Sequence, residues 1–564
     1  MKRIYQYICA SLALCSLSSC NDFLDILPMN NVVLENFWTQ KSDVTSVLMG
    51  CYESMENSDC ITRMAIWGEV RSDNLKYGQS APWEIEQIVK ENILPTNSFC
   101  RWTSFYQVIN RCNTVCHYAP MVHEKDPNYT EAEMKANVAE ATALRSLCYF
   151  YLIRTFRDVP FSRQPSIDDT QSYQIPATKF DDVLDSLVTD LEAVKDDAVR
   201  RYYTDDNPLA YTNSSRITRY AIYALLADLY LWKGDWDRCI ACCDYIINFK
   251  KEQYQEMKDR EGNLTDIDLF NDIPLILERT VGSNNSGNAY NEIFGTGNSF
   301  ESIFELFFRQ QMSGSNTFIT SYYGQANGTS FTLGRLIVPT DFYEGLPTQK
   351  TQLFNVTDCR AYENIYHYST ASHAVAKYTR QSVTFNTTGS ITEKSLDLGG
   401  EWRSTPYANW IIYRLTDIML MKAEALIEKG EANFDEAFDL INAVNMRANN
   451  ILTASATNML KKDTYITSQQ SMRELLMDER HRELMFEGKR WFDLVRMARR
   501  EGNTRNLANI VVPKQTVDQN SIKIKLADPN ILFFPYSRDE LKVNPYLEQN
   551  PAYRKGIDEE LSKN

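Results

Sequence analysis

The thiol of Cys20 stands where a covalent modification is expected. It directly follows a basic start, a short apolar segment (residues 8–17) and two serines. This order is typical of a secretory signal, and the apolar run is too short to span a bilayer. A cysteine directly after the small residues can accept a diacylglycerol thioether, and several acyl chains anchor a protein more firmly than one. The sequence therefore predicts a lipoprotein signal peptide at 1–19 and lipidation of Cys20; the alternative is a plain secretory peptide with an incidental cysteine.

Aromatic residues in loops form a second group of candidate functional residues. Many of the 32 Tyr and 9 Trp stand among Asn, Ser, Thr and Gly residues. Aromatic faces beside short polar side chains suit a neutral polar ligand with apolar faces, such as a sugar or a peptide. Trp83 and Trp402 are the best candidates, since each lies in a polar, Pro-containing loop, although such rings can also close loops onto the core. The predicted ligand-binding residues are Asp73, Asn74, Tyr77, Trp83, Tyr322, Tyr323, Trp402 and Tyr407.

The motifs of several enzyme and metal-site classes are missing from the sequence. It contains no G-x-S-x-G elbow, P-loop, full dinucleotide fingerprint or HExxH motif. Cys239 and Cys242 have neither a second CxxC nor a nearby His, so we expect buried free thiols rather than zinc ligands. We therefore predict no catalytic residues, no metal and no cofactor. A glycoside hydrolase stays open as an alternative, because its carboxylates pair in space rather than in sequence.

The charge of the chain excludes one class of partner. The formal net charge is −15, and loss of Lys2 and Arg3 with the signal peptide makes it −17. An acidic chain without a basic stripe does not suit the phosphate backbone of a nucleic acid. We therefore expect no nucleic-acid partner.

Two helical blocks, about 38–249 and 410–500, are separated by a loop-rich region at about 250–405. Apolar residues recur at helical spacing in both blocks, as in 130–154, whereas the central region alternates short apolar stretches with Gly, Asn, Ser and Thr clusters. Two segments follow the tetratricopeptide pattern, in which small residues let antiparallel helices approach closely. They are Tyr230, Gly234, Trp236 and Cys239, and, with two extra residues in the turn, Leu426, Gly430, Phe434 and Ala437.

A glutamate-rich helix is predicted near residue 480. Glu479, Glu483 and Glu487 recur every four residues, so we interpret the helix as scaffold in which these glutamates pair with the arginines of the same segment, Arg480, Arg482 and Arg490. His481 lacks the spacing of a metal ligand.

Motifs in order along nearly the whole mature chain resemble those of the SusD/RagB outer-membrane lipoproteins of Bacteroidetes. Arg157 and Ala552 depart from them, because the family usually has glycine at both positions. The matching segments are C-N-D-F-L-D at 20–25, G-E-V-R-S-D-N at 68–74, Y-x-x-I-x-R-x-N at 106–113, the A-x-x-L-R stretch with its D-V-P ending in 140–161, E-R-H-R-E-L-M-F-E-G-K-R-W-F-D-L at 479–494, and N-P … Q-N-P-A-Y at 544–553.

The resemblance implies a mainly α, non-catalytic receptor: one body, 20–564, with an N-terminal SusD-like part (about 20–249), a loop-rich insert (about 250–405) and a C-terminal RagB/SusD part (about 406–564). It implies a glycan ligand captured outside the cell, a lipid anchor in the outer membrane, and delivery to a SusC-like TonB-dependent transporter. A peptide-capturing relative of the same architecture is the alternative. The resemblance does not identify the contact residues.

Overall fold

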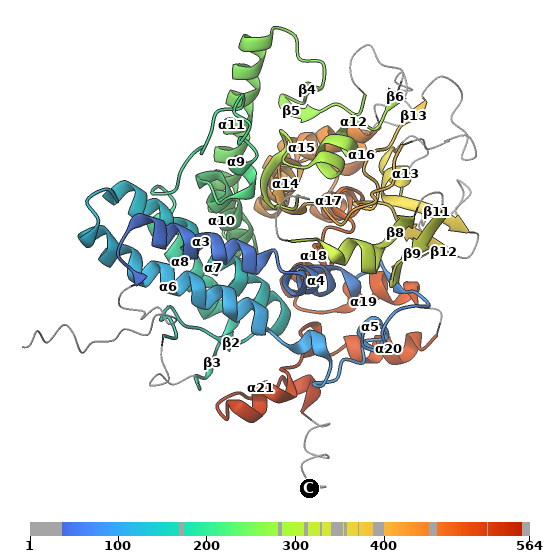
Figure 1. The fold of residues 1–564 in the computed structure, drawn as a ribbon. Helices are drawn as coiled ribbons and strands as arrows, with labels where there is room; N and C mark the ends of the chain where they lie inside the picture. The colour runs from blue at the N-terminus through green and yellow to red at the C-terminus, as the bar shows by residue number, and fades with distance from the viewer. Residues whose placement is uncertain are drawn as a thin grey trace, which may run out of the picture.

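The protein is mainly α-helical, as the sequence predicts, with short paired strands between two helical blocks (Figure 1). The computed structural model describes residues 37–167, 174–279, 285–309, 314–327, 330–339, 353–354, 358–369, 372–386, 400–449, 460–515 and 517–554. The signal peptide and Cys20 lie outside this part of the chain. Within it, no helix is long and apolar enough to cross a membrane.

The helices of the first block pack side by side in chain order. α3 packs on α6, and α6, α7, α8, α10 and α11 then each pack against the next. α11 continues this series into the second block by packing against α14. The helices are α3 (Lys41–Met55), α4 (Ser58–Ala65), α5 (Trp83–Val89), α6 (Thr103–Lys125), α7 (Glu131–Phe156), α8 (Phe180–Val194), α9 (Thr212–Ser215), α10 (Arg219–Lys233) and α11 (Trp236–Glu261), with a π-helix, η2 (Ile66–Val70), after α4.

Helix α7 is buried along most of its length. Its start is fixed by a capping box, in which Thr130 and Glu133 each bond the other's backbone N–H. The spacing of its apolar residues predicts one buried face. In the structure, however, every side chain from Ala139 to Phe156 is buried, so all sides of this part of the helix face the core. The reason is that α3, α6, α8 and α10 all pack against this helix.

The helical hairpin predicted at Tyr230–Cys239 is confirmed as α10 and α11. Gly234 ends α10 with φ +78°, a left-handed conformation that glycine adopts without strain. The carboxylate of Asp235 then accepts a hydrogen bond from the Arg238 N–H (3.3 Å) and caps α11.

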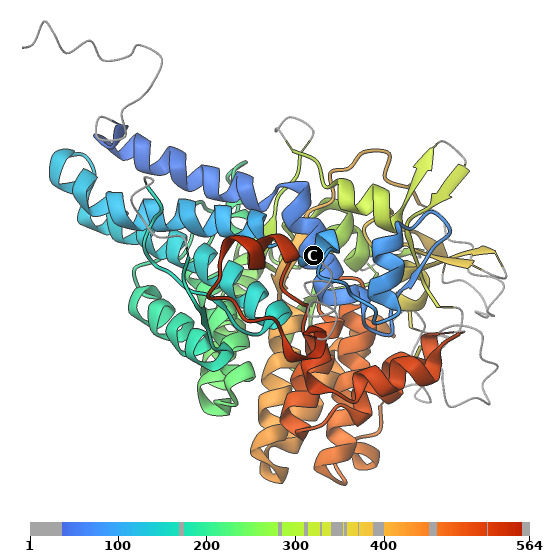
Figure 2. The ribbon, with the colours of Figure 1, turned by 90° about the horizontal axis from the view of Figure 1, so that it is seen from below.

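The second predicted hairpin is confirmed as α14 and α15. Its two extra turn residues are absorbed by a 3-10 turn, Glu431–Asn433, between the helices. Figure 2 shows these C-terminal helices, in orange, on the side of the molecule opposite the N-terminal helix α3. The helices of this block are α14 (Leu415–Lys429), α15 (Phe434–Ala448), α16 (Lys462–Tyr465), α17 (Gln469–Leu484), α18 (Arg490–Glu501), α19 (Arg505–Val511), α20 (Gln519–Leu526) and α21 (Arg538–Val543).

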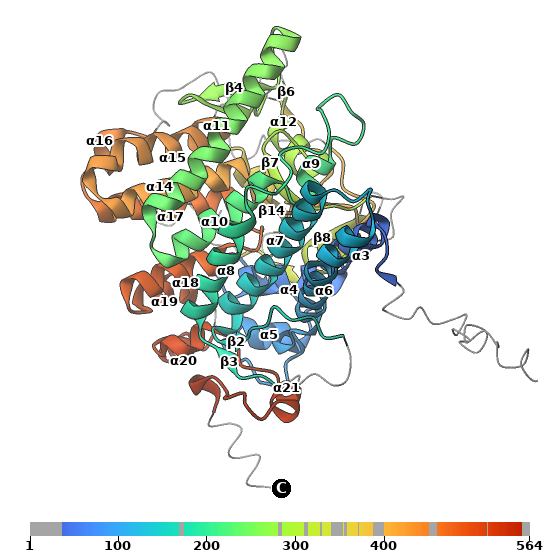
Figure 3. The same cartoon turned by 90° about the vertical axis from the view of Figure 1, so that its left-hand side faces the viewer.

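The insert between the blocks carries the short strands that its sequence predicts. It begins later than expected, because α11 continues as helix to Glu261, and the end of that helix projects beside β4 in Figure 3. Its strands include β4 (Ile267–Phe270), β5 (Ile273–Ile276), β6 (Asn285–Ser286), β7 (Ser302–Leu306), β8 (Gly324–Asn327), β9 (Ser330–Leu333), β10 (Leu336–Ile337), β11 (Ile365–Ser369), β12 (Ser372–Val375) and β13 (Phe385–Asn386); its short helices include α12 (Asn288–Tyr290) and α13 (Arg360–Asn364).

In the part of the chain that the structure describes, the strands form antiparallel, two-stranded sheets. Within the insert, β4 pairs with β5, β6 with β13, β8 with β9 and β11 with β12. Two pairs tie the insert to the helical blocks: β1 (Lys76–Tyr77) with β10, and β7 with β14 (Trp410–Arg414). The remaining pair joins β2 (Val159–Pro160) to β3 (Ala177–Thr178).

The cysteines of the described chain are free thiols, as predicted. Nine of the ten are buried, and Cys116 is half-buried. Burial raises the pKa of Cys242 to about 12, so this thiol stays protonated at neutral pH. The cysteines act as small apolar core groups.

Candidate functional site

Two segments that carry the sequence resemblance meet in the interior. Glu69, on η2, is fully buried, and its carboxylate accepts hydrogen bonds from the backbone N–H groups of Phe486 (2.9 Å) and Gly488 (3.0 Å). Burial raises the pKa of Glu69 to about 7. This contact joins the first helical block to the turn between α17 and α18, and we call it the Glu69 junction.

The first two predicted ligand residues belong to this junction. Asp73 accepts two hydrogen bonds from Arg490 (2.9 and 3.0 Å), and Asn74 donates to Glu69 (2.5 Å) and contacts Nε2 of His481. Although burial alone would raise it, Arg490 holds the pKa of Asp73 well below its usual range. Asn74 is fully buried and Asp73 is 9% exposed, so both hold the fold together and offer a ligand little surface.

Glu479, Glu483 and Glu487 are ion-paired, but mostly not with the predicted partners. Only Arg482 bonds as expected, to Glu479 (2.8 Å). Arg480 instead pairs with Asp417 and Asp493, and Arg490 with Asp73. The observed partners lie across the core: Arg360 for Glu479 and Glu483, Arg414 for Glu483 and Glu487, Arg447 for Glu483, and Lys377 for Glu487. The helical spacing suggested local pairs, whereas burial turns these side chains toward cations on other elements.

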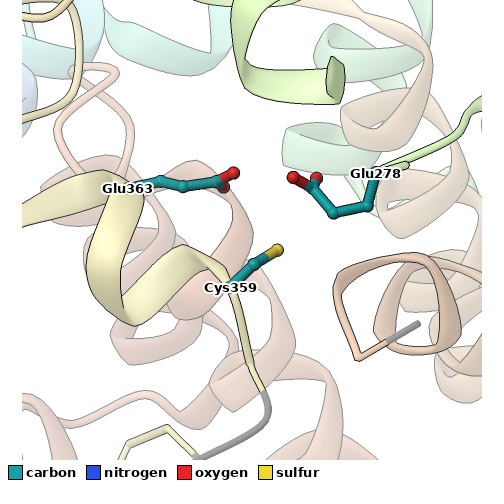
Figure 4. Close-up of side chains that lie close together, drawn as sticks. All are labelled: Glu278, Cys359 and Glu363. Carbon is teal, nitrogen blue, oxygen red and sulfur yellow. The ribbon is translucent and has the colours of Figure 1, made fainter. Parts of the chain in front are cut away.

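One cluster of potential metal-ligating groups occurs in the described chain. Glu278, Cys359 and Glu363 are buried, and one ligand atom from each lies within 4.8 Å of the others. In Figure 4 the two carboxyl groups point toward each other, with the sulfur beside them. Burial raises the pKa of Glu278, and burial together with the charge of Glu278 raises that of Glu363, so the interior favours the protonated forms of these carboxyl groups. The cluster could not be predicted from the sequence, because its two glutamates come from distant parts of the insert.

The aromatic groups that suit a ligand gather on the insert. The ring of Trp402 lies 4.6 Å from Phe331 and 4.9 Å from Tyr366, and those two rings lie 5.3 Å apart, measured between centroids. All three side chains are half-buried. The guanidinium of Arg380 lies 4.3 Å from the Trp402 ring. We call these four residues the aromatic platform.

Backbone pairing holds Trp402 in place. Residues 401–403 run antiparallel to residues 379–382, with hydrogen bonds such as Gln381 N–H to the Glu401 carbonyl (2.8 Å). Gly400 starts this segment with φ +110°, and a Cβ there would lie 2.2 Å from the Ser382 carbonyl oxygen. Only glycine permits this approach, so the position of Trp402 depends on it.

The other predicted aromatic residues are spread over several environments. Trp83, the first residue of α5, is 55% exposed. Tyr77 is half-buried on β1, with the Lys90 ammonium 5.5 Å from its ring, and Tyr407 is half-buried against the core. Tyr322 and Tyr323 are buried, and the Tyr323 hydroxyl donates to the Phe486 carbonyl (2.9 Å), so these two rings belong to the core.

Sequence reasoning missed Phe331, Tyr366 and Arg380. The first two are aromatic residues within short, mostly polar strands, such as Ser330-Phe331-Thr332. Such residues are candidates for exposed rings, because neighbouring side chains of a strand face opposite sides.

The fold and the platform together define a class: a protein of paired, repeat-like helices that presents an aromatic surface on a strand-bearing insert. The family model described as "SusD family" matches residues 284–553, and the one described as "Starch-binding associating with outer membrane" matches residues 22–231. The chain belongs to the SusD/RagB family, which confirms the resemblance.

Similar proteins span almost the same length. SusD-like protein P38 of Formosa agariphila is 23% identical over 555 residues, 95% of this chain and 96% of the relative. A SusD homolog of Bacteroides thetaiotaomicron has a similar structure, with a TM-score of 0.66, 17% identity and coverage of 92% and 99%. Surface glycan-binding protein A of the same organism, solved with laminarihexaose, has a TM-score of 0.61, 19% identity and coverage of 91% and 100%.

Proposed function

We propose that this protein is a cell-surface glycan-binding lipoprotein that captures an oligo- or polysaccharide and delivers it to a SusC-like TonB-dependent transporter in the outer membrane. Membership of the family and the glycan bound by a structural relative support this role. The body acts without catalysis, as a receptor. Capture of a peptide is the second candidate, because the same rings also suit apolar peptide side chains.

The aromatic platform is the observation that carries the proposal. Sugar rings present C–H groups on a face and hydroxyls around the edge, so they stack on partly exposed aromatic rings. Trp402, Phe331 and Tyr366 offer three such rings within a few ångströms of each other. The pairing of residues 401–403 with 379–382 fixes Trp402 before the ligand arrives, which lowers the entropy cost of binding.

Replacing Trp402 with alanine should weaken glycan binding. Loss of one stacked ring is expected to cost about 1–3 kcal/mol, which corresponds to a roughly 5- to 150-fold higher Kd. Isothermal titration calorimetry of the parent and Trp402→Ala against a panel of neutral oligosaccharides measures this change, and circular dichroism checks folding.

Tyr546→Ala is the matched control, because Tyr546 is 61% exposed and lies outside the platform. It should bind like the parent. Trp83→Ala tests the alternative site at α5. If Trp83→Ala loses glycan affinity while Trp402→Ala binds like the parent, the binding site lies at α5. Release of reducing ends from any bound oligosaccharide would contradict the receptor role and favour a hydrolase.

Anchoring is tested separately from binding. Cys20→Ala should release the protein from the outer membrane into soluble fractions, because no acyl chain then holds it. The measurement is cell fractionation in a strain without the partner transporter, with Cys51→Ala, a substitution of a buried core cysteine, as the control. A Cys20→Ala protein that stays membrane-bound like the parent contradicts lipid anchoring.

A further inference from the structure

A cavity lies where the first helical block contacts the insert. It has a volume of about 410 Å³ and is lined by the 200–218 segment, by α11 and by residues 296–309. That volume is within the range of small-ligand sites. In Figure 1, α9 and α11 lie well to the left of the β8–β9 and β11–β12 hairpins, so this cavity is separate from the aromatic platform.

The lining of this cavity is strongly basic. Five cationic side chains face it with a single carboxylate, Asp205, in a protein whose net charge is −15. We call it the basic cavity. Its cations are Arg200, Arg201, Lys250, Arg260 and Arg309.

Several of these cations have no anionic partner within the described chain. The Arg309 guanidinium stacks 4.6 Å from the Tyr211 ring and 4.9 Å from Phe307, with no carboxylate bound to it. Arg200 bonds the Tyr220 hydroxyl (3.2 Å) and likewise no carboxylate.

Lys250, on α11, is a third lining cation without a carboxylate partner in the described chain. It is only 5% exposed, and its ammonium donates to backbone carbonyls, including that of Ser302 (3.2 Å), and to the Gln253 side chain (3.3 Å). It forms no ion pair with a carboxylate of the described chain. Burial lowers the pKa of Lys250 to about 8, so its ammonium is still mostly protonated at neutral pH and adds positive charge beside the cavity.

Arginines without a carboxylate partner are not a general property of cavities in this protein, as a larger cavity in the second block shows. That cavity, of about 660 Å³, also contains arginines. There, however, Arg490 pairs with Asp73, Arg473 with Glu428 and Arg500 with Glu424. Each of these three arginines is therefore already balanced by a carboxylate, whereas the lysine of that cavity, Lys514, bonds the backbone carbonyls of Val70 (2.9 Å) and Ser72.

The other lining residues indicate which further groups the ligand should carry. Amide and hydroxyl side chains such as Asn213, Asn298 and Ser299 can bond hydroxyl groups, and the rings of Tyr211 and Phe300 offer flat apolar surface. A negatively charged ring that carries several hydroxyls matches all three features.

We propose that the basic cavity binds an acidic sugar unit of a glycan, through its carboxylate or sulfate group, with Arg200 and Arg309 as the anion-recognising residues and Lys250 as a further positive charge beside them. This inference rests on the proposed function, because it gives the captured glycan a chemical class. An extended acidic glycan then has two separate points of attachment, the charged unit here and an uncharged unit on the platform.

The test compares three probes of equal length by calorimetry: an oligogalacturonide, a sulfated chondroitin oligosaccharide and an uncharged malto-oligosaccharide. The full mature protein should bind one or both acidic probes, and an increase in NaCl from 50 to about 500 mM should weaken that binding. The Arg200→Gln/Arg309→Gln variant should lose at least tenfold in affinity for the acidic probe and keep its affinity for the neutral one. Comparison of the carboxylate and sulfate probes identifies the anionic group.

The control variant, Arg101→Gln/Arg505→Gln, removes the same charge from exposed positions outside the cavity. Equal loss in this control, or no binding of either acidic probe while the neutral one binds, overturns the inference and leaves the proposed function standing. Conversely, binding of an acidic probe can depend on Arg200 and Arg309 while Trp402→Ala binds every probe like the parent. That result supports the basic cavity as a binding site and excludes the aromatic platform.

Discussion

Glu483→Gln should unfold at a much lower urea concentration than the parent, with a loss of about 3–5 kcal/mol in the free energy of unfolding. The Glu483 carboxylate bonds three buried guanidinium groups, those of Arg414 (2.6 Å), Arg447 (2.5 Å) and Arg360 (2.8 Å). Although burial alone would raise it, these three cations hold the pKa of Glu483 well below its usual range. Glutamine keeps the shape but removes the charge, so the three cations lose a shared anion in the interior. Because a whole protein is stable by only about 5–15 kcal/mol, this loss is large.

Equilibrium urea denaturation followed by circular dichroism measures the effect. Glu131→Gln is the matched control, since it removes the same charge from an exposed i,i+4 pair with Lys135. Exposed pairs of this kind contribute little, so the control should have the parent's midpoint. Equal midpoints for Glu483→Gln and Glu131→Gln would show that the buried network is not a source of stability.

Gly68→Ala should prevent the Glu69 junction from closing. A Cβ at this position would lie 1.8 Å from the Gly488 carbonyl oxygen and 2.5 Å from its carbon. Both contacts are with backbone, which cannot move aside as a flexible side chain does, so the two segments must separate. We expect a destabilisation beyond the 1–3 kcal/mol or so typical of an overfilled core, or a protein that does not fold.

Gly50→Ala provides the comparison. Gly50 lies inside α3, and its added Cβ would meet only the end of the Arg111 side chain, at 3.7 Å. Alanine is favoured over glycine inside a helix by about 1 kcal/mol, so this variant should be as stable as the parent or slightly more so. Thermal unfolding of both variants tests the difference, and a parent-like midpoint for Gly68→Ala would contradict the tight contact.

The elements fixed by local patterns could be predicted from the sequence. Gly234 ends α10 and Gly430 ends α14 through backbone conformations that the residue type itself suggests. Both helix pairs were therefore recognisable before the structure, even with the longer turn in the second.

Interactions between distant residues could not be predicted in the same way. Arg480 has a glutamate three positions away, yet it bonds Asp417 and Asp493, because those carboxylates are buried beside it and the glutamate faces other cations. Tyr322 and Tyr323 lie in a polar stretch, yet their segment folds back into the core. Trp402 was recognisable as a candidate, but the platform exists only because four separate segments of the insert converge.

The Glu69 junction also has a consequence for the time at which the protein can finish folding. The first backbone donor to the Glu69 carboxylate is encoded 417 residues later. At a synthesis rate of about 5–20 residues per second, roughly 20–80 s separate the two. During that interval the Glu69 carboxylate lacks its backbone donors Phe486 and Gly488, so a chain that ends before residue 486 cannot form the junction. We therefore expect a truncated product to leave the Glu69 junction open and to be cut there by proteases that spare the complete chain.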